Sequence, residues 1–203
     1  MEHLPHVRHC PPGGSAPLWM PLVVVGLTAA ALWGILTVLG AGTLQTIPDD
    51  TRSAVLALVR VGNVMTALAA VAFWPLISLA FWCAGVLLVD GHPPEFRDLV
   101  YGIGLAHLPA MAGMMIIWVI VMAAGVSVPG AVMLSGGTRE YLESLAAVQI
   151  SRGIIVLAFL ATAVNFVRAV RALFRTSVLR AAAVVTAPLA LYYLGAFLLQ
   201  ASG

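Results

Sequence analysis

The chain alternates long apolar stretches with short segments that carry nearly all of its charged residues. A helix that crosses the hydrocarbon core of a bilayer needs roughly 20 mostly apolar residues. Five stretches meet this requirement, at about residues 18–39, 62–89, 99–125, 145–167 and 181–199. Backbone groups in lipid must form hydrogen bonds within their own segment, so each stretch is predicted to be an α-helix. The pattern therefore predicts an all-α integral membrane bundle of five transmembrane helices.

The residues before the first stretch form a tail rich in proline and histidine, at positions 1–17. The apolar run that follows is longer than the roughly 7–15 residues of a signal-peptide core, so we interpret it as a retained transmembrane helix. The connections between the stretches are short, and none has room for a second folded domain. We expect one membrane domain over residues 18–203, preceded by the tail.

The distribution of arginines predicts the orientation in the membrane. Arg168, Arg171, Arg175 and Arg180 lie between the fourth and fifth stretches with no acidic residue among them. Positive residues in short connections are retained on the cytoplasmic side, so this connection is predicted to be cytoplasmic. With five spans, the N-terminus is then cytoplasmic and the C-terminus lies outside. The same four arginines are predicted to contact anionic lipid headgroups, with a specific lipid or protein ligand as the alternative.

The composition is typical of a membrane protein, and it also bears on the organism of origin and on the kinds of partner. Hydrophobic residues make up 62% of the chain and charged residues 9%, whereas a soluble domain is about half apolar. A net charge of +2 without a basic stripe argues against nucleic-acid binding. All ten positive side chains are arginines, and together with the heavy use of Ala, Val, Leu and Gly this favours a GC-rich bacterial genome. We therefore expect the protein in a bacterial cytoplasmic membrane.

Small residues and prolines within the stretches predict how the helices pack and bend. Small residues spaced four apart let a neighbouring backbone approach closely. Such rows are Gly26, Ala30 and Gly34 in the first stretch, Gly62, Thr66 and Ala70 in the second, and Gly102, Ala106 and Ala110 in the third. Pro75, Pro109 and Pro188 each remove a backbone donor inside a stretch. We therefore expect bent helices in the second, third and fifth stretches.

Two ionisable side chains inside the stretches are the candidate site residues, because such groups in membrane helices usually serve a function. Arg152, three residues after Gln149, either binds an anionic group or extends to the membrane surface and pairs with Glu143 or Asp49. His107 is the candidate cofactor ligand. A bis-histidine haem site would need a second ligand from the tail or from a partner. A hydrogen-bonded packing histidine is therefore the favoured interpretation, and no bound cofactor is predicted.

The rest of the sequence contains few residues that suggest a metal site or catalysis. The tail brings His3, His6, His9 and Cys10 close together, and imidazole and thiolate groups can bind zinc or copper. Prolines interrupt the tail and the spacing matches no standard zinc pattern, so no metal site is predicted. The chain has no Gly-x-Ser-x-Gly elbow, no His-Glu-x-x-His helix, no phosphate-binding loop and no carboxylate pair within a stretch. We therefore expect a protein that is not an enzyme.

One part of the chain resembles a known family. Residues 73–76 read Phe-Trp-Pro-Leu in the middle of the second stretch, which runs to Asp90-Gly91, and the connection 95–99 reads Glu-Phe-Arg-Asp-Leu. The third stretch then begins with residues 101–109, Tyr-Gly-Ile-Gly-Leu-Ala-His-Leu-Pro. This order resembles the Yip-domain family of five-span membrane proteins, named for interacting with Ypt/Rab GTPases. The resemblance covers most of the chain from about residue 55, and for a bacterial relative it implies the fold without a settled activity.

Two functions from different classes are compatible with these observations. The first is a non-catalytic membrane scaffold or accessory subunit, which binds another integral membrane protein, forms a homo-oligomer or organises lipid. The second is a small transporter or a subunit that carries quinone, haem or pigment, with His107, Arg152 or the tail histidines touching the ligand. The first is favoured, because the stretches lack the buried polar groups that a transport path or redox site normally needs.

Overall fold

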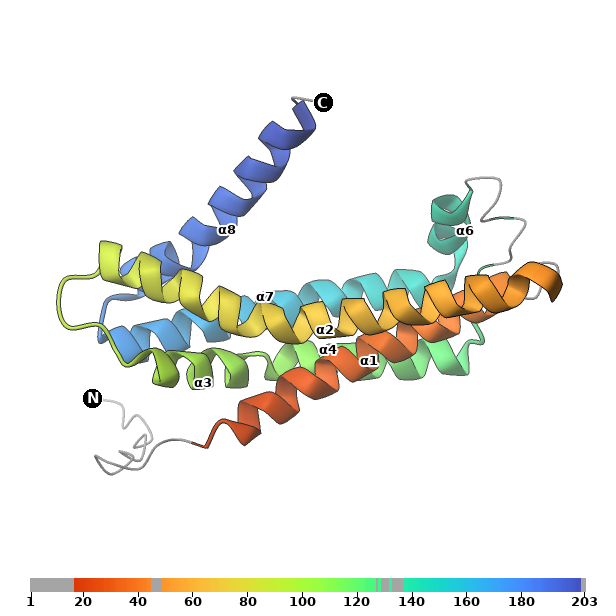
Figure 1. The fold of residues 1–203 in the computed structure, drawn as a ribbon. Helices are drawn as coiled ribbons and strands as arrows, with labels where there is room; N and C mark the ends of the chain where they lie inside the picture. The colour runs from red at the N-terminus through yellow and green to blue at the C-terminus, as the bar shows by residue number, and fades with distance from the viewer. Residues whose placement is uncertain (1–16, 45–48, 127, 129–131, 133–136, 202–203) are drawn as a thin grey trace.

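The computed structural model describes residues 17–44, 49–126, 128, 132 and 137–201, and this part of the chain is all α-helical (Figure 1). Its helices are α1 (Trp19–Leu44), α2 (Asp49–Leu88), α3 (Phe96–Ala106), α4 (Leu108–Ala123), α6 (Thr138–Ser144), α7 (Ala146–Phe174) and α8 (Val178–Ala201). The predicted all-α class is therefore confirmed. The tail with His3, His6, His9 and Cys10 lies outside the described residues.

Four helical stretches of the described chain are long and apolar enough to cross a membrane. They are Trp19–Gly40 in α1, Arg52–Leu88 in α2, Phe96–Ala123 across α3 and α4, and Ala146–Phe174 in α7. These helices lie alongside one another in an elongated bundle (Figure 1). α8 contributes a shorter apolar segment, Val178–Leu191. The lengths and composition support a multi-pass membrane protein.

α2 and α7 extend beyond the second and fourth stretches that hydropathy predicted. α2 begins at Asp49 rather than near residue 62, and its 40 residues give a length of about 60 Å. Residues 51–61 contain no Gly or Pro, so nothing in this segment ends the helix where the apolar run ends. α7 likewise continues to Phe174, which places Arg168 and Arg171 on its last turns rather than in a connection.

The third predicted stretch is divided into two helices at His107. α3 ends at Ala106 and α4 begins at Leu108, with Pro109 in its first turn. Pro109 has no N–H to donate to the carbonyl of Leu105, so the regular hydrogen-bond ladder is interrupted there. The backbone of His107 instead forms a tight turn to the carbonyl of Gly104, with an N···O distance of 3.2 Å. The helix is thus interrupted at Pro109, where a bend is predicted. α2 and α8 each continue through their internal proline, and the bends predicted there stay predictions.

The helices pack through two separate apolar cores. The larger core joins α2, α3, α7 and α8 around the fully buried Phe81, Leu99, Ile103, Val170 and Val184. The smaller core lies further along the bundle, where Ile35 of α1 meets Ile117 and Val121 of α4. Ser78 and Thr162 are buried polar residues, and each hydroxyl donates to the carbonyl four residues earlier in its own helix. The buried interior therefore consists of apolar side chains and of hydroxyl groups that form hydrogen bonds within their own helices.

Some of the small-residue rows lie at close helix contacts and others do not. A Cβ added at Gly34 would lie 2.6 Å from the Trp118 ring, and one at Gly102 would lie 3.1 Å from Leu173. These glycines let α1 approach α4 and α3 approach α7. A Cβ at Gly26 or Gly62 would meet nothing within 4 Å, so those glycines face the outside of the bundle.

α8 leaves the bundle after its first turns. Ala181, Val184 and Val185 are buried in the larger core, where α8 contacts α2 and α7. Further along, Leu191 and Leu194 are exposed, and the helix diverges from the others (Figure 1).

Candidate functional site

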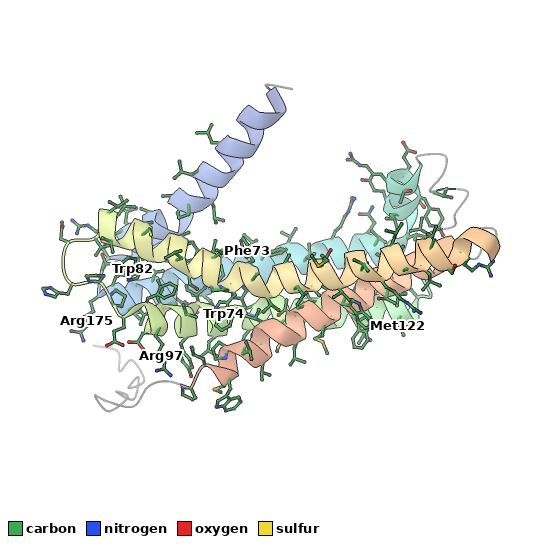
Figure 2. The ribbon with its side chains drawn as sticks, viewed as in Figure 1. Phe73, Trp74, Trp82, Arg97, Met122 and Arg175 are labelled. Atoms are coloured by element: carbon green, nitrogen blue, oxygen red, sulfur yellow. The ribbon has the colours of Figure 1, made fainter. Side chains whose placement is uncertain are left out.

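Polar side chains gather at the two ends of the bundle. The arginine-rich end holds Arg97, Arg168, Arg171, Arg175 and Arg180, and it includes the C-termini of α2 and α7. Figure 2 shows Arg97 and Arg175 at this end. The opposite end, which we call the α6 end, includes the C-termini of α1 and α4 and the N-termini of α2 and α7 (Figure 1).

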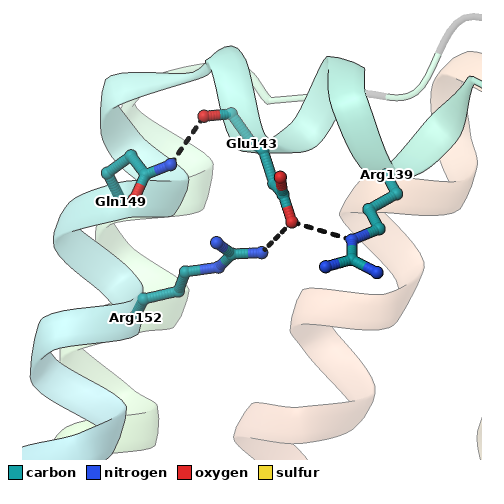
Figure 3. Close-up of polar contacts among 4 residues, drawn as sticks. All are labelled: Arg139, Glu143, Gln149 and Arg152. Atoms are coloured by element: carbon teal, nitrogen blue, oxygen red, sulfur yellow. Dashed lines mark hydrogen bonds and ion pairs between the residues drawn. The ribbon is translucent and has the colours of Figure 1, made fainter.

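Glu143 connects α6 to α7 at the α6 end (Figure 3). Its carboxylate oxygen Oε1 accepts hydrogen bonds from Arg152 Nη2 at 2.9 Å and from Arg139 Nε at 3.0 Å. The side-chain nitrogen of Gln149 donates to the backbone carbonyl of Glu143 at 2.6 Å. Leu145 separates the two helices with an extended backbone, which turns α6 so that its last residues face the side chains of α7. One acidic side chain thus fastens a seven-residue helix to a transmembrane helix.

Two guanidinium groups share the single carboxylate of Glu143. The hydrogen bond from Arg152, followed by that from Arg139, lowers the pKa of Glu143 below its usual value of 4.5. The carboxylate is therefore ionised at neutral pH, as acceptance of two guanidinium hydrogen bonds requires. The Arg152 side chain is 52% exposed, so its guanidinium lies at the surface of the bundle. Of the two partners considered from the sequence, the structure shows the pairing with Glu143.

His107 is held by contacts within the bundle. Its Nδ1 lies 2.8 Å from the carbonyl oxygen of Ile103, and because a carbonyl only accepts, Nδ1 carries the hydrogen. The ring packs edge-on against Phe166 with centroids 5.0 Å apart, and Phe166 packs in the same way against Phe81. No group of three or more His, Cys, Asp or Glu side chains with the arrangement of a metal site occurs among the described residues. These contacts are those of a hydrogen-bonded packing histidine, and the alternative role of His107 as a cofactor ligand stays a hypothesis.

The arginines between α7 and α8 are arranged on helix ends rather than in a loop. Arg171 lies in the last turn of α7, where a positive side chain interacts favourably with the helix dipole. Arg180 lies in the first turn of α8, and its Nη1 is 3.0 Å from Asp90 Oδ2. This ion pair ties α8 to the connection between α2 and α3. The sequence alone placed these arginines together but gave no sign of the pairing with Asp90.

Arg175 has an unusual backbone conformation. It follows the end of α7 with φ 49° and ψ 42°, the left-handed region. Helices often end with a residue in this conformation, which is usually glycine because a side chain there costs about 1 kcal/mol. Among the described non-glycine residues, Arg175 is the one with positive φ. An arginine in this position carries a charged side chain at a backbone cost that glycine would avoid.

A cleft opens at the arginine-rich end between the α2–α3 connection and the end of α7. Its volume is about 600 Å³, and its lining residues are Asp90, Gly91, His92, Pro94, Asp98, Ala172, Leu173, Phe174 and Arg175. Gly91 has φ 128°, a conformation open mainly to glycine, and it forms the turn into the connection. Trp82 Nε1 donates to the carbonyl of Pro94 at 3.2 Å and holds that connection against α2. The residues come from three separate segments, so hydropathy and motif spacing did not reveal this site.

Comparison with known proteins gives no relative for this chain. No family model matches it. No curated protein and no solved structure matches it either.

Proposed function

We propose that the protein is a non-catalytic membrane scaffold or accessory subunit, which binds another integral membrane protein or organises lipid. The observation that carries the proposal is a row of exposed apolar side chains along α2. The row consists of Leu58, Val61, Met65, Leu68, Leu76 and Leu79, which are between 46% and 72% exposed. Ala72, which is also exposed, fills the gap between Leu68 and Leu76.

The spacing of this row is compatible with a helix partner. Its members are three or four residues apart, the spacing by which one helix packs along another. An exposed apolar face also suits lipid chains, and the crosslinking experiment below distinguishes the two. The row covers about 32 Å of helix, comparable to the hydrocarbon core of a bilayer. α2 also contacts α1, α3 and α8, whereas the row is exposed along its length.

We also propose a topology of five spans, with the N-terminus and the arginine-rich end in the cytoplasm and the C-terminus outside. This orientation is supported by the arginines at that end, and by the start of α1 lying at the same end of the bundle (Figure 1). α8 would be the fifth span. The relationship to the Yip-domain family is proposed on residues 73–109, where an α2 with an internal Pro75 is followed by a turn at Gly91 and a short helix from Phe96.

The experiment that tests the scaffold is photo-crosslinking in the native membrane. A photo-reactive amino acid replaces Met65 in the α2 row, and Leu157 of α7, which is 68% exposed but outside the row, serves as the matched control. A scaffold gives a discrete protein adduct at Met65 and lipid adducts at Leu157. Lipid adducts alone at both positions would refute a protein partner for this row. The mass of the adduct distinguishes a second copy of the chain from a different protein.

A further inference from the structure

The cleft at the arginine-rich end has two rigid sides. One side is the end of α7, where the Phe174 ring packs so closely against Gly85 that a Cβ there would overlap it. The other side is the connection held by the hydrogen bond from Trp82 to Pro94 and continued by α3. α3 and α7 are themselves in contact where Gly102 meets Leu173. The cleft is therefore a feature of packed elements, and its volume of about 600 Å³ is within the range of small-molecule sites.

The cleft presents one positive and one negative group without a protein partner. Asp90 is already paired with Arg180. Arg175 on one side and Asp98 on the other form no ion pair with any described residue. A simple anion would meet the carboxylate of Asp98, and a simple cation would meet the guanidinium of Arg175. Both groups line the same cleft, so a ligand that complements both carries a negative and a positive charge.

The backbone of Arg175 is a second and independent indication that its side chain is used. Left-handed φ and ψ at the end of α7 would be adopted more readily by glycine. Backbone strain of this kind clusters at ligand sites, where a side chain is held in place for binding. The guanidinium is the group best suited to a phosphate, because its donors match two phosphate oxygens.

We propose that this cleft binds a phosphate–ammonium zwitterion, with Arg175 binding the phosphate and Asp98 accepting hydrogen bonds from the ammonium group. The cleft lies at the end of the transmembrane helices, so the source that fits the structure is the headgroup of an ethanolamine phospholipid. The same chemistry is present in free phosphoethanolamine. The inference rests on the proposed membrane placement of this end, and it specifies which lipid the scaffold recognises.

The test is native mass spectrometry of the full chain, titrated with defined phospholipids in mild detergent. Phosphatidylcholine is zwitterionic but its nitrogen has no hydrogen to donate, and phosphatidylglycerol has the phosphate without an amine. Phosphatidylethanolamine should bind about tenfold more tightly than either, the difference expected for one charge-assisted hydrogen bond. Equal binding of the three lipids would overturn the proposal.

Two variants separate the roles of the charged groups. Arg175→Gly removes the guanidinium while suiting the left-handed backbone, so folding is retained and phosphatidylethanolamine binding should weaken about tenfold. Asp98→Asn should abolish the preference for phosphatidylethanolamine over phosphatidylcholine and leave a common, weaker affinity. Arg139→Gln, which removes a charge at the α6 end, is the control and should change neither quantity. Variants that bind as the wild type does would contradict the assignment.

Free phosphoethanolamine distinguishes the two sources. Added to the protein in nanodiscs of phosphatidylcholine, it binds in the cleft if the ligand is soluble, and it fails to bind if lipid anchoring is required. Binding of neither the lipid nor the free compound would refute the shared chemistry. Selective lipid binding without a protein adduct at Met65 would remove the protein partner from the proposed function and leave this inference intact.

Discussion

Replacement of Gly104 by alanine is expected to loosen the junction of the first three transmembrane segments. A Cβ at this position would overlap Pro21 of α1 and would lie 2.9 Å from two atoms of the Trp74 indole. Pro21 is fully buried and Trp74 is nearly so. Neither neighbour has free space to move into, so the added methyl group must displace one helix.

The size of the effect follows from the contacts of Trp74. Its Nε1 donates to the backbone carbonyl of Val100 at 2.8 Å, so a shift of the indole also weakens a buried hydrogen bond. Overpacking costs about 1–3 kcal/mol, and loss of the hydrogen bond costs about 1 kcal/mol. The higher helix propensity of alanine offsets this loss of stability by up to about 1 kcal/mol. The free energy of unfolding should therefore fall by about 2 kcal/mol in Gly104→Ala.

Thermal unfolding in detergent, followed by near-ultraviolet circular dichroism, measures this change. A loss of about 2 kcal/mol should lower Tm by about 4–8 °C for a chain of this size. Gly62→Ala is the control, because a Cβ there meets nothing within 4 Å, and it should leave Tm unchanged or slightly raised. Trp74→Phe should rescue part of the loss in Gly104→Ala, since the smaller ring leaves room for the methyl group. Equal Tm values for the two alanine variants would show that the helices do not meet at Gly104.

Two further predictions concern the ends of the bundle. Hydrogen bonds from Arg152 and then Arg139 lower the pKa of Glu143 below 4.5, so the contact between α6 and α7 is complete at neutral pH and is lost as the pH falls through that lowered pKa. The hydrogen-exchange protection of α6 should fall over the same pH range. Glu143→Gln should reduce this protection already at neutral pH. Equal protection in the variant and the wild type would show that the carboxylate does not hold α6. Ser177→Cys, with the native cysteines replaced, should resist impermeant thiol reagents in intact cells while Ser53→Cys is labelled. Labelling at position 177 would reverse the proposed topology.

Hydropathy predicted the helices well and their ends poorly. The apolar runs located α1, α2, α7 and the α3–α4 pair, because a helix that crosses lipid must be apolar over the whole hydrocarbon core. The extra residues at the start of α2 and the end of α7 were missed, since a helix in water is limited by caps and breakers rather than by hydropathy. α6 was missed for the same reason: the segment Thr138–Ser144 is short and polar.

The candidate sites were predictable only where partners are close in sequence. Arg152 and Glu143 are nine residues apart along the chain, so charge and proximity in sequence identified Glu143 as one of two possible partners. Asp90 and Arg180 form an ion pair across 90 residues, and spacing carries no information about such a contact. The left-handed conformation of Arg175 was likewise invisible, because the sequence there has no glycine to mark the end of the helix.

Arg152 and Arg168, which lie at the two ends of the uncharged run of α7, set a hydrophobic thickness for this helix. Arg152 and Arg168 are 16 residues apart on this helix, which is about 24 Å along its axis, whereas an average bilayer has a hydrocarbon core of about 30 Å. Arg152 is tied to Glu143 at 2.9 Å, so its guanidinium stays at the depth that α6 allows. The mismatch is relieved when lipids around α7 shorten. The apolar row of α2 covers about 32 Å, so we expect the bilayer to be thinner beside α7 than beside α2.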